Sequence, residues 1–214
     1  MHQDLERVDF GDSRGLVMAR RHPNGLGYVA LSAYVEPTVI VGPEAVVYGH
    51  ARVLEAVRVL GHARVGGNAL VEELATVSDY AQVDEQSHLF GSAQIFGCAR
   101  TFGAAQIGGN ARVFDYAKIG GHATVIDNAW VFGSTLVHES AYVAGTARIQ
   151  EQAVIRGQAR VSGYVQVRGG AQVHGNAYVA GNCSLNGDVI VKDDARVVGF
   201  AEFATGVVTG DEEG

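Results

Sequence analysis

The sequence has few residues that cross-link or sharply bend a chain, and it has no long apolar run. Three prolines, two cysteines and one tryptophan occur among its 214 residues. No apolar run approaches the roughly 20 residues that a membrane-spanning helix needs. The opening MHQDLERVDF also lacks the basic and apolar regions of a secretory signal. We therefore expect a protein of the cytoplasm or of a virion, with no membrane partner.

Basic residues are also scarce. Sixteen Lys and Arg against 23 Asp and Glu give a formal net charge of −7, and Asp211, Glu212 and Glu213 supply three of the negative charges. No block of consecutive basic residues stands out. Because an acidic chain repels nucleic acid and anionic membranes, we expect no nucleic acid partner.

Glycine, by contrast, is abundant, and it marks a six-residue repeat. The pattern is clearest between Ala93 and Ser134, which read AQIFGC ARTFGA AQIGGN ARVFDY AKIGGH ATVIDN AWVFGS. Of thirty such units between residues 27 and 206, 29 have Val, Ile, Leu or Phe at the third position, and 22 begin with Ala. Thr101 is the exception at the third position. No unit is interrupted, so the sequence predicts a repeat architecture.

The period of six predicts short strands joined by tight turns. Positions one and three of a strand point to the same side, so the small and branched residues form the interior. The 3.6-residue period of an α-helix is absent. Three consecutive units make one triangular coil. Ten coils at about 4.8 Å per layer then form a prism roughly 50 Å long.

Two short segments lie outside the repeat. In residues 1–26, two apolar pieces surround a Gly/Asp/Ser turn between Val8 and Ala19, which is typical of a hairpin. This N-terminal segment either caps the first coil of the 27–206 repeat or docks a protein partner, because the end of a stacked β array exposes unpaired backbone groups. Residues 207–214 have no pattern and are predicted to form an acidic tail.

The two cysteines cannot form a disulfide in such a prism. Cys98 and Cys183 lie between four and five coils apart when the units are counted along the sequence. That separation is about 20 Å or more along the stack, far beyond the reach of a disulfide. Both are predicted to be free thiols.

The units VYGHAR, VGGNAL, IGGNAR and IGGHAT resemble those of the hexapeptide-repeat superfamily of left-handed parallel β-helices. The resemblance covers about five-sixths of the chain and is closest to the YdcK-like branch and to repeat proteins of phage particles. It implies an all-β fold, namely a single-stranded left-handed parallel β-helix of about ten triangular coils with a short N-terminal cap. Trimers are common in this superfamily, so the resemblance also implies a homotrimer.

The same resemblance implies an alternative function as an acyltransferase. Enzymes of this superfamily use a histidine as general base at a subunit boundary, with acetyl-CoA or another acyl-CoA, beside a loop that breaks the repeat. On this reading the candidate bases are His122, His50 and His138. No loop leaves the repeat here, so little would enclose a coenzyme. The zinc enzymes of the fold use a closely spaced histidine pair, which the repeat lacks. We therefore expect no metal and no cofactor, and we favour a non-catalytic protein.

The strongest positive signal is aromatic. Assigning the units to three faces places Phe96, Phe114 and Phe132 in one outward slot, one coil apart, with Trp130 beside them. An apolar patch on one face usually marks an interface. The predicted interface residues are Phe96, Phe114, Phe132, Trp130, Tyr116, Tyr80 and Leu60. The sequence thus predicts a structural or binding module that forms a homotrimer through this face, with a phage particle or another assembly as its setting.

Overall fold

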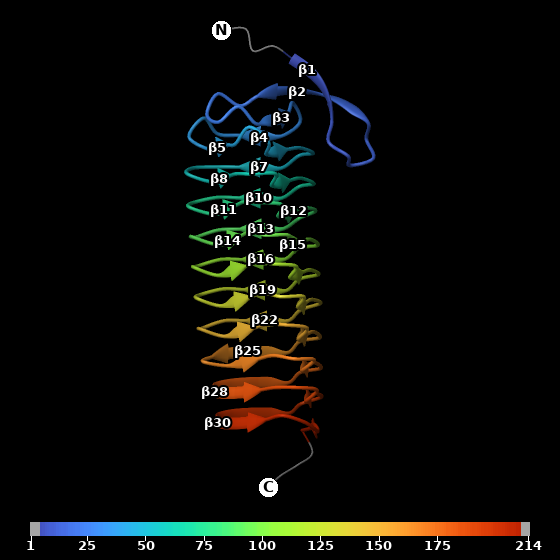
Figure 1. The fold of residues 1–214 in the computed structure, drawn as a ribbon, viewed down its shortest axis with the longest axis vertical. Coiled ribbons are helices and arrows are strands. Elements are labelled where there is room, and N and C mark those ends of the chain that lie inside the picture. The colour runs from blue at the N-terminus through green and yellow to red at the C-terminus, as the bar shows by residue number, and fades with distance from the viewer. Residues whose placement is uncertain (1–4, 211–214) are drawn as a thin grey trace.

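The structure is a computed structural model that describes residues 5–210, and these form one stack of short parallel strands with a hairpin at its N-terminal end (Figure 1). Thirty-one strands and no helix occur in this range. One sheet of 13 strands and another of 18 strands run the length of the stack. The prediction of an all-β parallel solenoid of about ten coils is therefore confirmed. Within residues 5–210, no helix is long and apolar enough to cross a membrane.

Each coil places one strand on each of three faces, which we name by their outward side chains. The basic face consists of β3 (Tyr28–Ala30), β6 (Val46–Val47), β9 (Arg64–Val65), β12 (Gln82–Val83), β15 (Arg100–Thr101), β18 (Lys118–Ile119), β21 (Leu136–Val137), β24 (Val154–Ile155), β27 (Gln172–Val173), β29 (Ile190–Val191) and β31 (Val207–Val208). The tyrosine–arginine face consists of β4 (Tyr34–Val35), β7 (Arg52–Val53), β10 (Leu70–Val71), β13 (His88–Leu89), β16 (Gln106–Ile107), β19 (Thr124–Val125), β22 (Tyr142–Val143), β25 (Arg160–Gly163) and the first halves of β28 (Tyr178–Leu185) and β30 (Arg196–Phe203). The aromatic face consists of β5 (Ile40–Val41), β8 (Arg58–Val59), β11 (Thr76–Val77), β14 (Gln94–Ile95), β17 (Arg112–Val113), β20 (Trp130–Val131), β23 (Arg148–Ile149), β26 (Gln166–Val167) and the second halves of β28 and β30.

The strand register is constant from coil to coil until the last coil. Tyr28 pairs with Val46, for example, and every later coil repeats that step up to β30. In the last coil Ile190 of β29 pairs with Val207 of β31, which is one residue earlier than a full coil would place its partner. Strand pairing also extends to Val208, past residue 206, where the sequence predicted the end of the repeat. Residues 211–214 of the predicted acidic tail lie outside the described part of the chain.

The interior is a column of small and branched side chains. Every first and third position of the units between Val39 and Val191 is buried, most of them completely. Burial of a valine or isoleucine stabilises the fold by roughly 1.5–3 kcal/mol, so the stacked third positions supply most of the core. Three polar residues interrupt this core. The hydroxyl of Ser87 donates to the Asp84 carbonyl at 2.7 Å, whereas those of Thr101 and Thr135 have no hydrogen-bond partner among residues 5–210.

Acidic residues and glycines share the corner positions. The fifth residue of a unit has a φ near +60° at most corners, which glycine adopts freely and L-residues rarely adopt. At seven corners an acidic residue stands there, and its carboxylate accepts the backbone N–H of the glycine at the same corner of the next coil. Seven such bonds, at 2.7–3.1 Å, join Glu73 to Gly91, Asp79 to Gly97, Glu85 to Gly103, Asp115 to Gly133, Asp127 to Gly145, Glu139 to Gly157 and Glu151 to Gly169. These seven carboxylates thus connect neighbouring coils.

The N-terminal hairpin extends the sheet of the basic face. Strands β1 (Leu5–Asp9) and β2 (Leu16–Arg21) are antiparallel, and β2 pairs with β3 in the first coil. The loop between them reaches along the basic face, where Phe10 stacks on Tyr48 with ring centroids 5.7 Å apart. A guanidinium nitrogen of Arg64 donates to the Phe10 carbonyl. The hairpin therefore contacts the first three coils.

Candidate functional site

The aromatic face carries a stack of three phenylalanines. Phe114 lies parallel to Phe96 and to Phe132, with ring centroids 4.7 Å and 4.8 Å apart. The three residues occupy the position after strands β14, β17 and β20, so the constant register brings them one above another. The placement deduced from the sequence repeat is therefore found in the structure, while a role in an interface stays a prediction.

The stacked rings are half-buried because each covers the faces of its neighbours. Their edges remain accessible, which is a smaller apolar surface than three isolated phenylalanines would present. Trp130 lies beside the stack, with its ring 6.3 Å from that of Phe114 in an edge-on arrangement. The guanidinium groups of Arg112 and Arg148 lie 5.1 Å and 5.2 Å from the Trp130 ring, which adds cation–π attraction.

The adjoining corner is the more exposed part of the predicted interface. Tyr80 is 60% exposed and stacks on His62 at 4.9 Å, and Tyr116 is 65% exposed. Cys98, an exposed free thiol, lies in the same corner column between these tyrosines. Leu60 is half-buried on the aromatic face and is separated from the phenylalanine stack by one coil. The apolar surface therefore continues from the face around the corner.

The three histidines considered as bases lie apart. His50 and His122 are exposed at the same corner, but four coils separate them, which is about 20 Å. His138 is half-buried on the basic face, with its Nε2 atom 3.5 Å from a carboxylate oxygen of Glu139. The structure does not bring the three into one site.

A better oriented histidine lies on the tyrosine–arginine face. The Nε2 atom of His88 is 2.8 Å from Oε1 of Glu72, and its ring is 4.9 Å from Phe90. A carboxylate that orients an imidazole is the usual support for a general base. The sequence interpretation missed this pair, because the two residues do not share a position in the repeat. Leu70 is the register partner of His88, and Glu72 lies just beyond it, so the pair meets diagonally across neighbouring strands.

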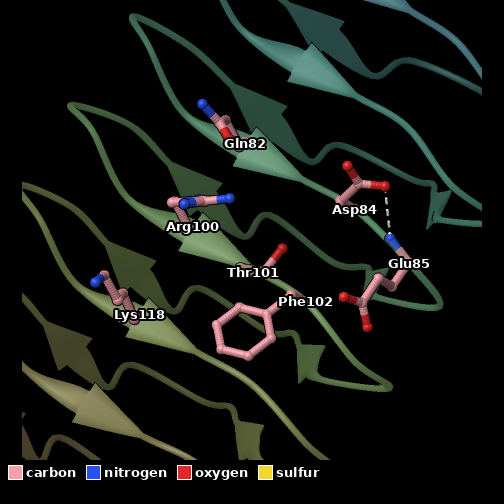
Figure 2. A pocket seen from close by; sticks show the side chains of 7 residues that line it. All are labelled: Gln82, Asp84, Glu85, Arg100, Thr101, Phe102 and Lys118. Carbon is pink, nitrogen blue, oxygen red and sulfur yellow. Dashed lines mark hydrogen bonds between the residues drawn. The ribbon is translucent and has the colours of Figure 1, made fainter. Parts of the chain in front are cut away.

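The basic face holds a surface groove of about 390 Å³ that runs across several coils (Figure 2). Gln82, Arg100 and Lys118 line it from the consecutive strands β12, β15 and β18. Two further grooves, of about 540 Å³ and about 510 Å³, also include Arg100 among their lining residues. Arg100 thus lies where three depressions meet.

The far side of this groove is formed by acidic and aromatic side chains. Asp84 accepts a hydrogen bond from the Tyr48 hydroxyl at 2.9 Å and from the Glu85 amide at 2.8 Å. Burial and the neighbouring Asp84 raise the pKa of Tyr48, so this phenol stays protonated as a donor. Phe102 forms the remaining wall (Figure 2).

The C-terminal half of the basic face presents a row of nitrogen-bearing side chains. His138, Arg156, His174 and Lys192 follow one another in four consecutive coils. Burial and the neighbouring Arg156 lower the pKa of His174 below its ordinary value. Within residues 5–210, no group of three or more His, Cys, Asp or Glu side chains could hold a metal ion.

Comparisons with known proteins point to the same architecture. A family model described as the YdcK beta-solenoid repeat matches residues 105–117, in agreement with the resemblance seen in the sequence. No curated protein matches the chain significantly.

Solved structures that match include three acyltransferases. LpxA from Acinetobacter baumannii is 10% identical, with 86% of this chain and 71% of that chain covered and a TM-score of 0.46. The UDP-N-acetylglucosamine O-acyltransferase LpxA from Moraxella catarrhalis is 13% identical, with coverage of 89% and 71% and a TM-score of 0.38. The Arabidopsis UDP-N-acetylglucosamine acyltransferase is 15% identical, with coverage of 88% and 70% and a TM-score of 0.31.

Proposed function

We propose that the protein is a non-catalytic binding module that assembles as a homotrimer through its aromatic face. The proposal rests on the aromatic side chains that gather on one face of the middle coils and at its adjoining corner. They comprise the stack of Phe96, Phe114 and Phe132 and the exposed corner tyrosines Tyr80 and Tyr116. Aromatic side chains with accessible edges bury large areas on association and are enriched in interfaces.

The dimensions of the prism suit such an assembly. A standard interface covers about 800 Å² on each partner, a small part of the 10330 Å² accessible surface of this chain. A closed threefold ring uses the same surfaces on every copy and leaves none of them unpaired. The uninterrupted coils make each copy a straight rod, so three parallel rods can stay in contact along their length.

A rigid trimeric rod would serve as a spacer or a docking element in a larger assembly. A phage particle is the setting that the sequence resemblance favours, and the protein would then act in the cytoplasm of a host or in the virion. A protein partner would bind at the N-terminal hairpin, whose Leu5 and Leu16 are exposed. Neither nucleic acid nor a cofactor enters this proposal.

The second candidate function is acyl transfer at a boundary between subunits. His138 favours it, because this half-buried histidine lies 3.5 Å from Glu139 on an accessible face. An acyl-CoA would be the acyl donor, and His122 and His50 would be the other candidate bases. Thermal unfolding with and without acetyl-CoA separates the two functions. A raised unfolding midpoint with acetyl-CoA would favour the enzyme, whereas an unchanged midpoint agrees with a non-catalytic module.

Native mass spectrometry tests the assembly. The proposal predicts a species of three times the 22.5 kDa chain mass, and this species should persist on dilution to low micromolar concentration. A monomer throughout would reject the trimer. A dimer would reject the threefold ring while leaving open which surface forms the contact.

A further inference from the structure

The basic face places two positive charges directly opposite each other. Arg100 of β15 and Lys118 of β18 are paired residues of adjacent strands, so their backbones are about 4.8 Å apart. Both side chains are exposed, and within residues 5–210 neither belongs to a salt bridge. Like charges in direct register destabilise a sheet, so the pair costs stability unless something compensates it.

The other strands keep their cations apart. On the aromatic face Trp130 lies in register between Arg112 and Arg148, and both guanidinium groups are attracted to its ring. On the tyrosine–arginine face Tyr178 separates two arginines in the same way. Among the paired strands of residues 5–210, only β15 and β18 set two cations in register. The exception coincides with the point where the grooves meet.

The carboxylates that line the groove are already used by the protein. Both oxygens of Asp84 accept hydrogen bonds, one from Tyr48 and one from the Glu85 amide. Glu85 accepts the backbone N–H of Gly103 at 2.8 Å and so holds the corner between two coils. Asp84 and Glu85 keep their negative charge, but within residues 5–210 neither carboxylate forms an ion pair with Arg100 or Lys118.

We propose that this groove binds a tetrahedral oxyanion, phosphate or sulfate, between Arg100 and Lys118. Two adjacent cations match a doubly charged group, and arginine can donate two hydrogen bonds to one phosphate. Gln82, the register partner of Arg100 on the other side, adds an amide donor to the same row (Figure 2). The Phe102 ring forms a wall against which the remainder of a phosphorylated or sulfated ligand would lie.

The two proposals rest on different residues, although Arg100 and Lys118 share a second groove with Cys98 and Tyr116 at the corner of the proposed interface. Arg100 and Lys118 belong to the basic face, whereas the phenylalanine stack belongs to the aromatic face. Phe102 follows Arg100 in the chain and lies on the side away from the Tyr116 corner. Loss of anion binding would therefore leave the assembly proposal untouched, and a monomeric protein would leave the anion site intact.

Isothermal titration calorimetry with inorganic phosphate and with inorganic sulfate, at constant ionic strength, tests the site. The wild-type chain should bind one anion per chain, and Arg100→Gln or Lys118→Gln should weaken binding at least tenfold. Arg160→Gln is the matched control, since Arg160 is an outward strand residue of another face. Its binding should equal that of the wild type.

Thermal unfolding gives a second readout that needs no activity. In low-salt buffer without phosphate or sulfate, Lys118→Gln should raise the unfolding midpoint, because it removes the repulsion from Arg100. Addition of phosphate should raise the wild-type midpoint by mass action and leave that of Lys118→Gln unchanged. Absence of saturable binding, equal weakening by Arg160→Gln, or acetate binding as tightly as phosphate would each overturn the proposal.

Discussion

The ring of Phe102 covers Gly120 in the next coil and occupies the space that a β-carbon at residue 120 would need. An ideal Cβ there would lie 2.3 Å from two ring atoms of Phe102. The same relationship recurs between other neighbouring coils, each time with the glycine one coil after the aromatic residue. The three pairs are Tyr48 with Gly66, Phe90 with Gly108 and Phe102 with Gly120. These glycines have ordinary negative φ values, so the aromatic ring is the reason for glycine at these positions.

Substitution of Gly120 by Ala should therefore destabilise the protein through this contact alone. The displaced Phe102 ring would cost about 1–3 kcal/mol, as in other overpacked sites, measured by urea unfolding. In a Phe102→Ala background the same Gly120→Ala change should be neutral or stabilising by up to about 1 kcal/mol, because alanine restricts the unfolded chain. An equal cost in both backgrounds would show that the ring does not exclude the β-carbon.

The acidic corner residues provide a second prediction. Asp127 has a φ of 63° and accepts the Gly145 amide at 2.9 Å. Asp127→Ala loses this bond and keeps the left-handed backbone strain, so it should cost about 1–2 kcal/mol in urea unfolding. Asp127→Asn retains an oxygen acceptor and tolerates this backbone conformation, so its cost should be smaller. Equal costs for the two variants would contradict the role assigned to the carboxylate.

The row of cations on the basic face predicts a dependence of stability on pH. Burial and Arg156 lower the pKa of His174 below 6.5 in the folded protein. The unfolded chain then binds a proton at higher pH than the folded chain, so stability falls as the pH drops through 6.5. The thermal midpoint of His174→Gln should change less than that of the wild type between about pH 7.5 and about pH 5. Arg156→Gln should reduce the pH dependence of the thermal midpoint in part. Identical curves of midpoint against pH for the wild type, His174→Gln and Arg156→Gln would refute the role assigned to His174.

The two thiols report on the corner next to the aromatic face. Cys98 is exposed near Tyr116, whereas Cys183 is buried, and burial raises the pKa of the Cys183 thiol. A monomer should react with a thiol reagent rapidly at one site, and Cys98→Ser should abolish that fast phase. If the trimer covers this corner, the wild type should react severalfold more slowly than a dissociated variant. Equal rates for a trimeric wild type and a dissociated variant would place the contact elsewhere.

Much of the fold could be predicted because a solenoid repeats one local rule. The burial of Ala at the first position and Val or Ile at the third follows from strand alternation, and the unbroken six-residue period sets the register. The shorter last coil could not be predicted from the sequence, because residues 201–206 (AEFATG) still have Ala at the first and Phe at the third position of the six-residue repeat. In the structure Ile190 pairs with Val207, whereas the full coil length of the earlier repeats would pair it with Val208.

Less of the candidate site could be predicted, because side chains in neighbouring coils meet diagonally. The column of Phe96, Phe114 and Phe132 follows from the register alone, but the mutual burial of the rings depends on their rotamers. The contact of His88 with Glu72 requires both the register and the direction of two flexible side chains. No block of consecutive basic residues stands out in the sequence, but the strand register makes Arg100 and Lys118, which lie 18 residues apart in the chain, direct strand partners.

The ends of the prism offer a competing contact surface. Phe200 in the last long strand, β30, is 89% exposed, and Val198 beside it is 55% exposed. End-to-end association through β30 would produce chains of copies rather than a closed ring. Phe200→Ser therefore distinguishes this arrangement from contact through the aromatic face.

The most direct test of the proposed assembly is the native mass of Phe114→Ser measured beside the wild type, Tyr142→Ser and Phe200→Ser. Phe114 is the central ring of the stack, and Tyr142 is an outward aromatic residue of another face. Assembly through the aromatic face predicts a monomer for Phe114→Ser, with an unchanged circular dichroism spectrum, and a trimer for the other three proteins. A trimer of Phe114→Ser, or its loss in Phe200→Ser alone, would contradict assembly through the aromatic face.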